Sequence, residues 1–271
     1  MSQKRMLKVL SLILSLILII TVTFIPRTVK ANTRLSQTRI NRLSNYVSNL
    51  NDSDFDAFLV DYINSNEKSG KTFKEIQEEL SDVGVYVTMT STSYNQNANN
   101  INNDVSPLYI SPSKVQLRSY AAKRNGEVYY RVFSEVTFNQ KELKPGGLDL
   151  LSVEWDYNKA TYYKTSQSPN FVTYMDGSQR NRGICLFNVE DKSMWSGDYC
   201  YAVVYVKAKP SCYDIDIATK YIHTYNTTNV TWAVGVNVNY TAAGPTGGFS
   251  YSISGQNLSD TWQLFDDNTF R

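Results

Sequence analysis

The spacing of the apolar residues changes near Gly84, and this change constrains the fold more than any other feature of the chain. Before Gly84 the apolar residues recur every three or four positions, which is typical of amphipathic helices. From residue 114 onward they recur at every second position, which is typical of half-buried strands. The sequence therefore predicts an α+β fold, with a small N-terminal helical segment followed by a mainly β domain.

Three apolar stripes at helical spacing lie within residues 33–83, and each must be buried against another element. They are Leu43, Tyr46, Val47 and Leu50, then Phe55, Phe58, Leu59, Tyr62 and Ile63, and finally Phe73, Ile76, Leu80 and Val83. Thr72 and Glu75 have the spacing of a capping box, and Gly84 stands where the last helix should end. We expect a three-helix segment over residues 32–84.

The rest of the chain divides into a linker and a β domain. Residues 85–113 open with a short alternating run and are then rich in Asn, Ser, Gln and Pro, which predicts a linker or long loop. Residues 114–271 contain strand-like runs separated by turn sequences such as Asn125-Gly126 and Asp176-Gly177. Short strands without intervening helices favour an antiparallel sandwich or an elongated β domain over a parallel α/β sheet.

A predicted C-terminal hairpin, residues 230–254, shows the strictest alternation. One face carries the apolar residues Trp232, Val234, Val236, Val238, Tyr240, Phe249, Tyr251 and Ile253. Small and polar residues occupy the other face. The first strand, 230–240, has the length of about 9–11 residues that a membrane-crossing β-strand needs. A soluble sandwich with one face on its core produces the same alternation, so the pattern leaves both interpretations open.

The first 31 residues have the layout of a secretory signal peptide. Three basic residues precede an uncharged apolar run, 9–25, and Val29-Lys30-Ala31 supplies small or branched residues at the cleavage site. We expect cleavage after Ala31 and a secreted, extracellular protein. The alternative is an uncleaved anchor through residues 9–25, which is slightly shorter than the about 20 residues of a typical membrane-spanning helix.

Charge argues against nucleic acid as a partner. The whole chain has 27 basic and 25 acidic residues, and five of the basic ones precede Asn32, so the remainder carries about −3 instead of +2. A nucleic-acid-binding protein would carry clustered Lys and Arg on one face. The expected partners are a target membrane or a cell-envelope component, with further copies of the same chain as another candidate.

Catalytic motifs are scarce. His223 is the chain's single histidine, and no G-x-S-x-G motif precedes it, so we interpret it as an exposed or structurally satisfied strand residue. Asp214 and Asp216 would share one face of a strand, as calcium ligands or paired acids do, but a solvated edge explains them more simply. We therefore predict no catalytic, cofactor or metal site and no enzymatic activity.

Three cysteines are present, and an exported protein can form a disulfide. Cys185 and Cys200 flank what reads as one strand–turn–strand unit, so they are the candidate pair, with Cys212 left free. The competing interpretation is that all three are small buried hydrophobic residues.

Two functions from different classes fit these features. The first is a secreted, non-enzymatic, membrane-active or antibacterial protein, resembling toxins or bacteriocins in architecture, that acts through hairpin 230–254. The alternative is a surface or envelope binding module that recognises glycan or protein through exposed aromatic residues. The chain is rich in tyrosine, and adjacent pairs such as Tyr129-Tyr130 and Tyr162-Tyr163 place one ring on each face of a strand.

Overall fold

The computed structural model describes residues 35–89, 110–143, 145–175, 178–225, 231–234, 251–254 and 261–270. Residues 231–234 and 251–254 are described for their backbone alone. Residues 36–271 belong to one compact unit. The predicted signal peptide 1–31, the alternative anchor 9–25 and most of the expected linker lie outside the described residues.

The three predicted helices are confirmed. They are α2 (Gln37–Asn49), α3 (Asp52–Lys68) and α4 (Phe73–Asp82). Each begins at a side-chain cap, because Ser36, Asn51 and Thr72 accept a hydrogen bond from a backbone N–H three residues later. The capping box of Thr72 and Glu75 is formed, and Gly84 adopts a left-handed φ of 82° just after α4. No helix among the described residues is long and apolar enough to cross a membrane.

The β domain contains two five-stranded sheets in which every strand pair is antiparallel. The first sheet has the order β1 (Val85–Thr88), β2 (Val115–Arg124), β3 (Tyr130–Phe138), β8 (Tyr199–Ala208), β5 (Ala160–Gln167). The second has the order β12 (Thr261–Phe270), β9 (Ile215–Thr224), β4 (Asp149–Trp155), β7 (Ile184–Val189), β6 (Val172–Tyr174). Single-turn 3₁₀ helices η1 (Pro112–Lys114), η2 (Arg180–Arg182) and η3 (Asp191–Ser193) lie between strands. The predicted mainly β, α+β sandwich is thus confirmed.

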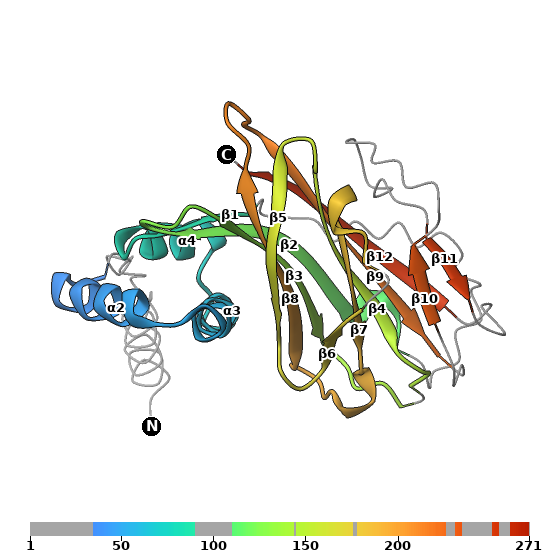
Figure 1. Cartoon of the computed structure of the whole chain (residues 1–271). Coiled ribbons are helices and arrows are strands. Elements are labelled where there is room, and N and C mark those ends of the chain that lie inside the picture. Colours follow the sequence, from blue (N-terminus) through green and yellow to red (C-terminus); the bar gives the residue numbers. More distant parts are fainter. Residues whose placement is uncertain are drawn as a thin grey trace, which may run out of the picture. The chain divides into compact units, whose positions relative to one another are not determined.

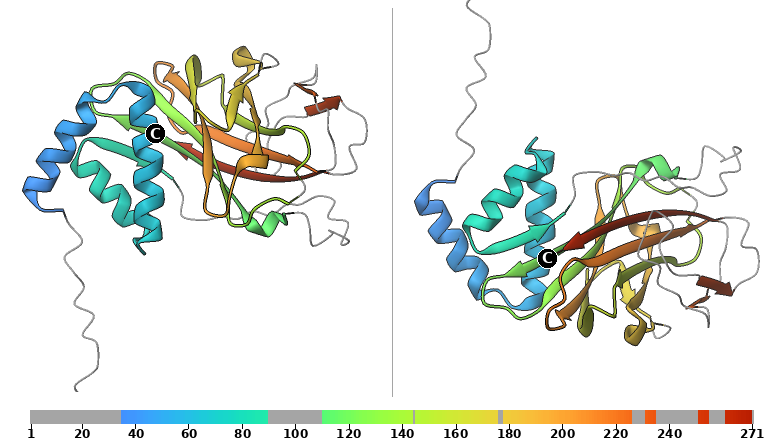
Figure 2. Two further views of the ribbon diagram at one scale, coloured as in Figure 1. Left: turned by 90° about the horizontal axis from the view of Figure 1, so that it is seen from below. Right: turned by 90° about the horizontal axis from the view of Figure 1, so that it is seen from above.

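The helices, the first sheet and the second sheet form three successive layers (Figure 1). The two further views in Figure 2 show α2, α3 and α4 together on one face of the first sheet. One hydrophobic core lies between the two sheets, and the other lies between the first sheet and the helices. The first sheet is therefore covered on both faces, most completely at its central strands β3 and β8.

Strand β8 shows how one strand supplies both cores. Cys200, Ala202, Val204 and Val206 face the second sheet. Their neighbours Tyr201, Val203 and Tyr205 face the helices. Because both faces are covered, the strand is apolar at successive positions and does not alternate with polar residues.

The open edge of β2 is satisfied by the last strand of the chain. Strand β1 pairs only with residues 121–124 of β2, so residues 115–120 pair with β3 on one side and with no described strand of the first sheet on the other. From β12, the Asp266 carboxylate accepts the Ser119 N–H at 2.6 Å, and the Asn268 amide donates to the Ser119 carbonyl at 3.3 Å. These contacts join the two sheets along one edge. Asp266 therefore lies on strand β12 and binds the backbone of the neighbouring sheet.

Candidate functional site

The described part of the hairpin is a short ribbon. Strand β10 (Thr231–Val234) pairs antiparallel with β11 (Tyr251–Ser254), and the register sets Trp232 opposite Ile253 and Val234 opposite Tyr251. The other predicted membrane-facing residues lie outside the described part of the chain. They are Val236, Val238, Tyr240 and Phe249.

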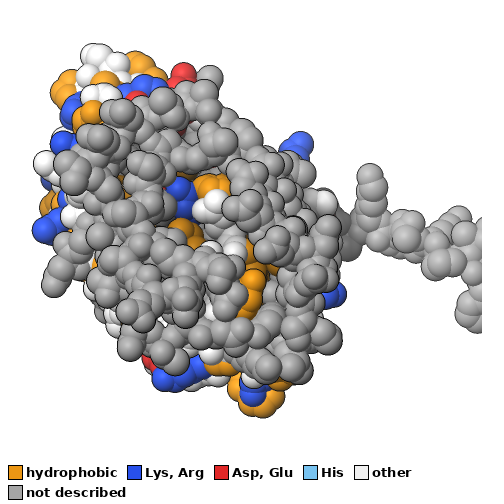
Figure 3. All heavy atoms as spheres, turned by 90° about the vertical axis from the view of Figure 1, so that its right-hand side faces the viewer, with side chains coloured by type: hydrophobic (Ala, Val, Ile, Leu, Met, Phe, Trp, Pro, Cys, Tyr) orange, Lys and Arg blue, Asp and Glu red, His pale blue; other side chains and the backbone are white. Residues whose placement is uncertain are grey.

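This ribbon is a sheet of its own. Within the described strands, β10 and β11 pair only with each other and with neither five-stranded sheet. The side of the molecule that carries them in Figure 1 faces the reader in Figure 3. Among the described side chains visible there, hydrophobic groups and Lys or Arg predominate, and few are acidic (Figure 3).

Exposed aromatic residues lie at both ends of β8. Trp195, 62% exposed, precedes the strand, and the Lys141 ammonium lies 3.5 Å from its ring centroid. Tyr213, 72% exposed, follows the strand. Tyr157 lies near the same end as Tyr213, because Lys159 donates to the Asp214 carbonyl and Lys209 donates to the Tyr157 carbonyl. The aromatic residues therefore form at least two separate groups.

Asp214 and Asp216 do not form the paired site considered from the sequence. Asp214 lies in the turn before β9 with a positive φ of 51°. Asp216 is on the strand, where its carboxylate lies 3.3 Å from Lys159 Nζ and accepts the Thr269 hydroxyl proton at 2.8 Å. The two residues thus have different conformations, and Asp216 already has partners.

The predicted disulfide between Cys185 and Cys200 is absent, because all three cysteines are free. Cys185 lies on β7 of the second sheet and Cys200 on β8 of the first sheet, so they do not belong to one strand–turn–strand unit. Both are fully buried in the core between the sheets. Burial raises the pKa of the Cys185 thiol to about 12, which keeps it protonated and unreactive.

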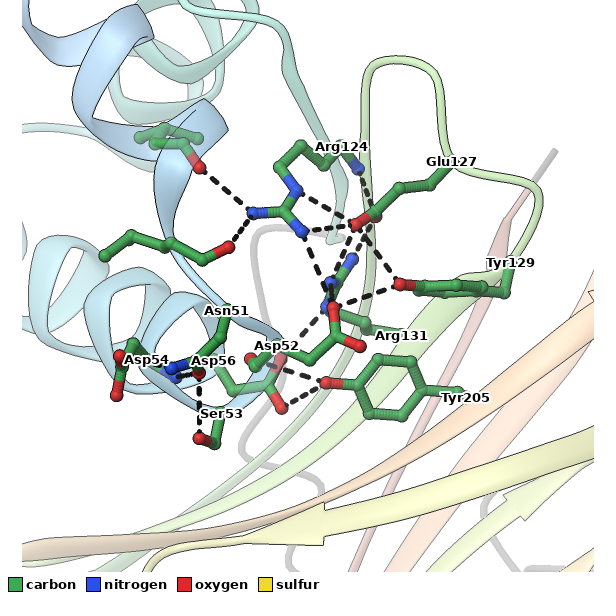
Figure 4. Close-up of polar contacts among 12 residues, drawn as sticks. Asn51, Asp52, Ser53, Asp54, Asp56, Arg124, Glu127, Tyr129, Arg131 and Tyr205 are labelled. Atoms are coloured by element: carbon green, nitrogen blue, oxygen red, sulfur yellow. Dashed lines mark hydrogen bonds and ion pairs between the residues drawn. The ribbon is translucent and has the colours of Figure 1, made fainter.

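A network of buried charges joins α3 to the first sheet. In Figure 4 the guanidinium of Arg131 lies among the carboxylates of Asp52, Asp56 and Glu127. Arg131 Nε donates to Asp56 at 3.0 Å, and Nη2 donates to Asp52 at 2.7 Å. Arg124 also binds Glu127, and Lys164 binds Asp52, so three cations face three carboxylates. We call these six residues the Arg131 network.

Hydrogen bonds complete the Arg131 network. Tyr205 and Tyr129 donate their hydroxyl protons to Asp56 and Asp52, respectively. Partial burial raises the pKa of Asp52, but Lys164, Tyr129 and Arg131 outweigh it and hold the pKa below its usual range. Because each charge has a partner, the network serves to fix the helices on the sheet.

A second buried cluster lies between the two sheets and contains His223. The residue is the penultimate one of β9 and is 0% exposed, so it is not an exposed strand histidine. Three buried carboxylates surround it: Asp149 at the start of β4, Asp191 in η3, and Glu142 in the loop after β3. We call these four residues the His223 cluster. No sequence pattern indicated the cluster, because its members come from four separate segments.

The distances within the His223 cluster are short. His223 Nδ1 lies 3.0 Å from Asp149 Oδ2 and 3.5 Å from Asp191 Oδ2. On the other side of the ring, Nε2 lies 3.3 Å from Glu142 Oε2. The indole of Trp262 packs on the imidazole with ring centroids 4.8 Å apart. One atom from each of Asp149, Asp191 and His223 lies within 4.8 Å of the others, which is close enough for all three to ligate one metal ion.

The hydrogen bonds are distributed unevenly within the His223 cluster. Asp149 accepts from the Tyr221 hydroxyl, from the Thr224 N–H at 2.7 Å and from the Thr224 hydroxyl at 3.2 Å. Glu142 accepts the Ile110 N–H at 2.7 Å. By contrast, neither carboxylate oxygen of Asp191 accepts a hydrogen bond from the described residues.

The arrangement of the His223 cluster shifts the pKa values of its members. Burial alone would lower the pKa of His223, but the carboxylates of Asp149, Glu142 and Asp191 outweigh it and raise the pKa to about 10. Burial raises the pKa of Asp191, and the neighbouring Asp149 carboxylate raises it further. The cluster therefore has an excess of negative groups that must be compensated by protons or by another cation.

Comparisons with known proteins give little help. No family model matches the chain. No curated protein matches it either. Among solved structures, one chain of a cohesin–dockerin complex is similar at 12% identity and a TM-score of 0.26, over 34% of this chain and 70% of that chain. A likeness of that size supports no conclusion about fold or function, so the family of this chain is not shown.

Proposed function

We propose that this chain is an exported, non-enzymatic protein of the membrane-active type, and that it acts on a target membrane through hairpin 230–254. The observation that carries the proposal is that, among the described strands, β10 and β11 pair only with each other and with neither five-stranded sheet. An isolated two-stranded ribbon is marginally stable by itself, so its strands exchange partners at low cost.

The register supports the same proposal. It pairs Trp232 with Ile253 and Val234 with Tyr251, which are the apolar positions of the alternating pattern. Small or hydroxyl residues, Ala233 and Ser252, pair with each other at the intervening position. A membrane-crossing hairpin needs this combination, with apolar residues toward lipid and small polar residues toward the lumen.

The layout of the leader adds weight to the proposal. The signal-peptide layout of residues 1–31 would deliver the protein outside the cell that makes it.

The experiment is dye release from liposomes, performed with the exported form and with two variants of adjacent residues. Val236→Asp places a carboxylate on the apolar face, at a cost on the order of 2 kcal/mol at mid-membrane, so leakage should be lost. Asn237→Asp changes the opposite face with almost no change in shape, so leakage should persist with altered ion selectivity. Circular dichroism establishes that both variants fold. A wild-type protein that releases no dye from either neutral or anionic vesicles would contradict the proposal.

A binding module is the second candidate, and the exposed Tyr157 and Tyr213 near one end of β8 favour it. Exposed aromatic rings bind sugars and protein surfaces through their apolar faces. The measurement is a glycan array together with cell-wall pull-down. Retention that is lost in Tyr213→Ala and kept in Val236→Asp would favour this function over membrane action.

A further inference from the structure

The His223 cluster has the composition and geometry of a metal site. We propose that it binds one divalent transition-metal ion of the zinc type, with His223 Nδ1, Asp149 Oδ2 and Asp191 Oδ2 as ligands. The proposal does not depend on the membrane function, because the three ligands lie in the core between the sheets and not on hairpin 230–254.

The spacing of the three atoms fits a small ion. A tetrahedral zinc ion with bonds of about 2.0–2.1 Å holds its ligand atoms roughly 3.3–3.4 Å apart. In the structure Nδ1 of His223 lies 3.0 Å from Asp149 Oδ2 and 3.5 Å from Asp191 Oδ2. Small adjustments of buried side chains therefore suffice to place an ion between them.

Asp191 supplies an independent argument for a cation. Its side chain is 1% exposed, and neither carboxylate oxygen accepts a hydrogen bond from the described residues. Nδ1 of His223 carries at most one proton and is closer to Asp149, which has hydrogen bonds from Tyr221 and Thr224 as well. A buried carboxylate that accepts no hydrogen bond destabilises the folded state, so a cation beside Asp191 would stabilise it.

Glu142 and Tyr221 supply the surroundings that metal ligands usually have. A histidine bound to a metal through one nitrogen commonly directs the N–H of the other toward a carboxylate. Here Nε2 faces Glu142 Oε2 at 3.3 Å, while the Ile110 N–H holds that same oxygen at 2.7 Å. The Tyr221 hydroxyl and the Thr224 N–H orient Asp149 in a comparable way. We assign Glu142 as a positioning residue.

The chemistry of the donors selects the class of ion. Calcium prefers six to eight oxygen ligands, and magnesium retains several waters, so neither suits a buried site with an imidazole and two carboxylates. Imidazole and carboxylate together suit zinc and its neighbours in the first transition series. Two carboxylates and a neutral imidazole also balance the charge of a divalent ion, and His223 would release its Nδ1 proton to solvent on binding.

The test is to unfold the full chain and refold it with Zn²⁺, since the ligands are buried in the folded protein. After gel filtration, the wild type should retain one Zn²⁺ per chain, and a competing chelator gives its affinity. Glu142→Gln changes a residue that positions a ligand, so it should weaken the zinc affinity by about 10–100-fold. Asp191→Asn changes a ligand itself, so its loss of zinc affinity should be larger. The matched control is Asp266→Asn, which alters a partly buried carboxylate outside the cluster and should retain the ion.

X-ray absorption of the zinc-loaded wild type gives a second readout that needs no variant. The expected spectrum has nitrogen and oxygen ligands at about 2.0–2.2 Å and no sulfur at about 2.3 Å. No retained zinc in the wild type would overturn the proposal, as would equal affinity in Asp191→Asn. A sulfur ligand would also overturn it, because it would assign the ion to a cysteine.

Discussion

The Arg131 network and the His223 cluster are both buried groups of charges, yet they differ in balance. In the Arg131 network three cations face three carboxylates, and tyrosine hydroxyls complete the hydrogen bonds. In the His223 cluster three carboxylates face one imidazole, and Asp191 lacks hydrogen-bond donors among the described residues. A network in which every charge has a partner stabilises the packing of two layers. A cluster with an excess of carboxylates can instead bind a cation.

Removal of the central cation should have the largest effect on stability. Arg131→Ala leaves Asp52, Asp56 and Glu127 without their shared partner, and breaking a buried pair in this way costs about 3–5 kcal/mol. Urea unfolding measures the change in free energy. As a control, Arg180→Ala removes an exposed guanidinium and should cost less than about 0.5 kcal/mol. Similar losses in both variants would contradict the structural role assigned to Arg131.

The pH dependence of the metal-free protein should reveal the His223 cluster. The pKa of His223 is about 10 in the folded protein against 6.5 for the unperturbed residue. The folded state therefore binds the proton more tightly, so this contribution to stability is complete below about pH 6.5 and is lost as the pH rises through 10.

The groups that face His223 are Asp149, Asp191 and Glu142, with Tyr221 and Trp262 packed beside its ring. Urea unfolding with chelator present, repeated between pH 6 and pH 10, measures the predicted fall in the free energy of unfolding. Zinc-loaded protein is the reference, because a coordinated imidazole no longer takes up that proton. A flat profile for the metal-free protein would contradict the raised pKa.

Replacing an aspartate with asparagine should destabilise the protein more in the Arg131 network than in the His223 cluster. At pH 8, Asp56→Asn removes a carboxylate that binds Arg131 and Tyr205, and hydrogen bonds to charged groups contribute about 1.5–3 kcal/mol. Asp191→Asn in chelator removes a carboxylate without hydrogen bonds, so its effect should stay within about 1 kcal/mol and can be stabilising. Thermal melts of both variants measure the difference, and a larger loss for Asp191→Asn would reverse the distinction between the clusters.

Reductant should have the smallest effect. The three cysteines are free, so dithiothreitol should leave the melting temperature unchanged, whereas loss of a native disulfide typically costs about 2–5 kcal/mol. A clear fall in melting temperature, or a mixed peptide of Cys185 and Cys200 in non-reducing mapping, would restore the disulfide predicted from the sequence.

Local patterns predicted the elements well where the cause is local. The capping box at Thr72 and Glu75 and the left-handed Gly84 set the limits of α4 through contacts within a few residues. Turn residues separate the strands over a similarly short range, whereas alternation fails in β8, which is apolar at successive positions because both of its faces are buried. Strand β5 (Ala160–Gln167) shows no clear apolar alternation, because half-buried polar residues dominate this edge strand.

The two candidate sites differ in whether a local sequence pattern reveals them. The alternation of hairpin 230–254 is visible in the sequence, and the described register of β10 and β11 agrees with it at the four pairs that are placed. The His223 cluster has no local pattern, because its four members are spread over the chain from Glu142 to His223, a difference of 81 in residue number. A single histidine on an alternating strand gave no reason to expect three carboxylates around it.

The sequence by itself determined the three helices, the antiparallel β character and the amphipathic stripe of the hairpin, because each depends on periodicity and on neighbours a few residues away. The tertiary structure alone decided that Cys185 and Cys200 lie on different sheets and that Asp266 completes the edge of β2. It also decided that His223 faces the core with Asp149, Asp191 and Glu142 around it. These outcomes depend on strand order and sheet packing, which bring distant residues together and set their burial, and no local pattern encodes them.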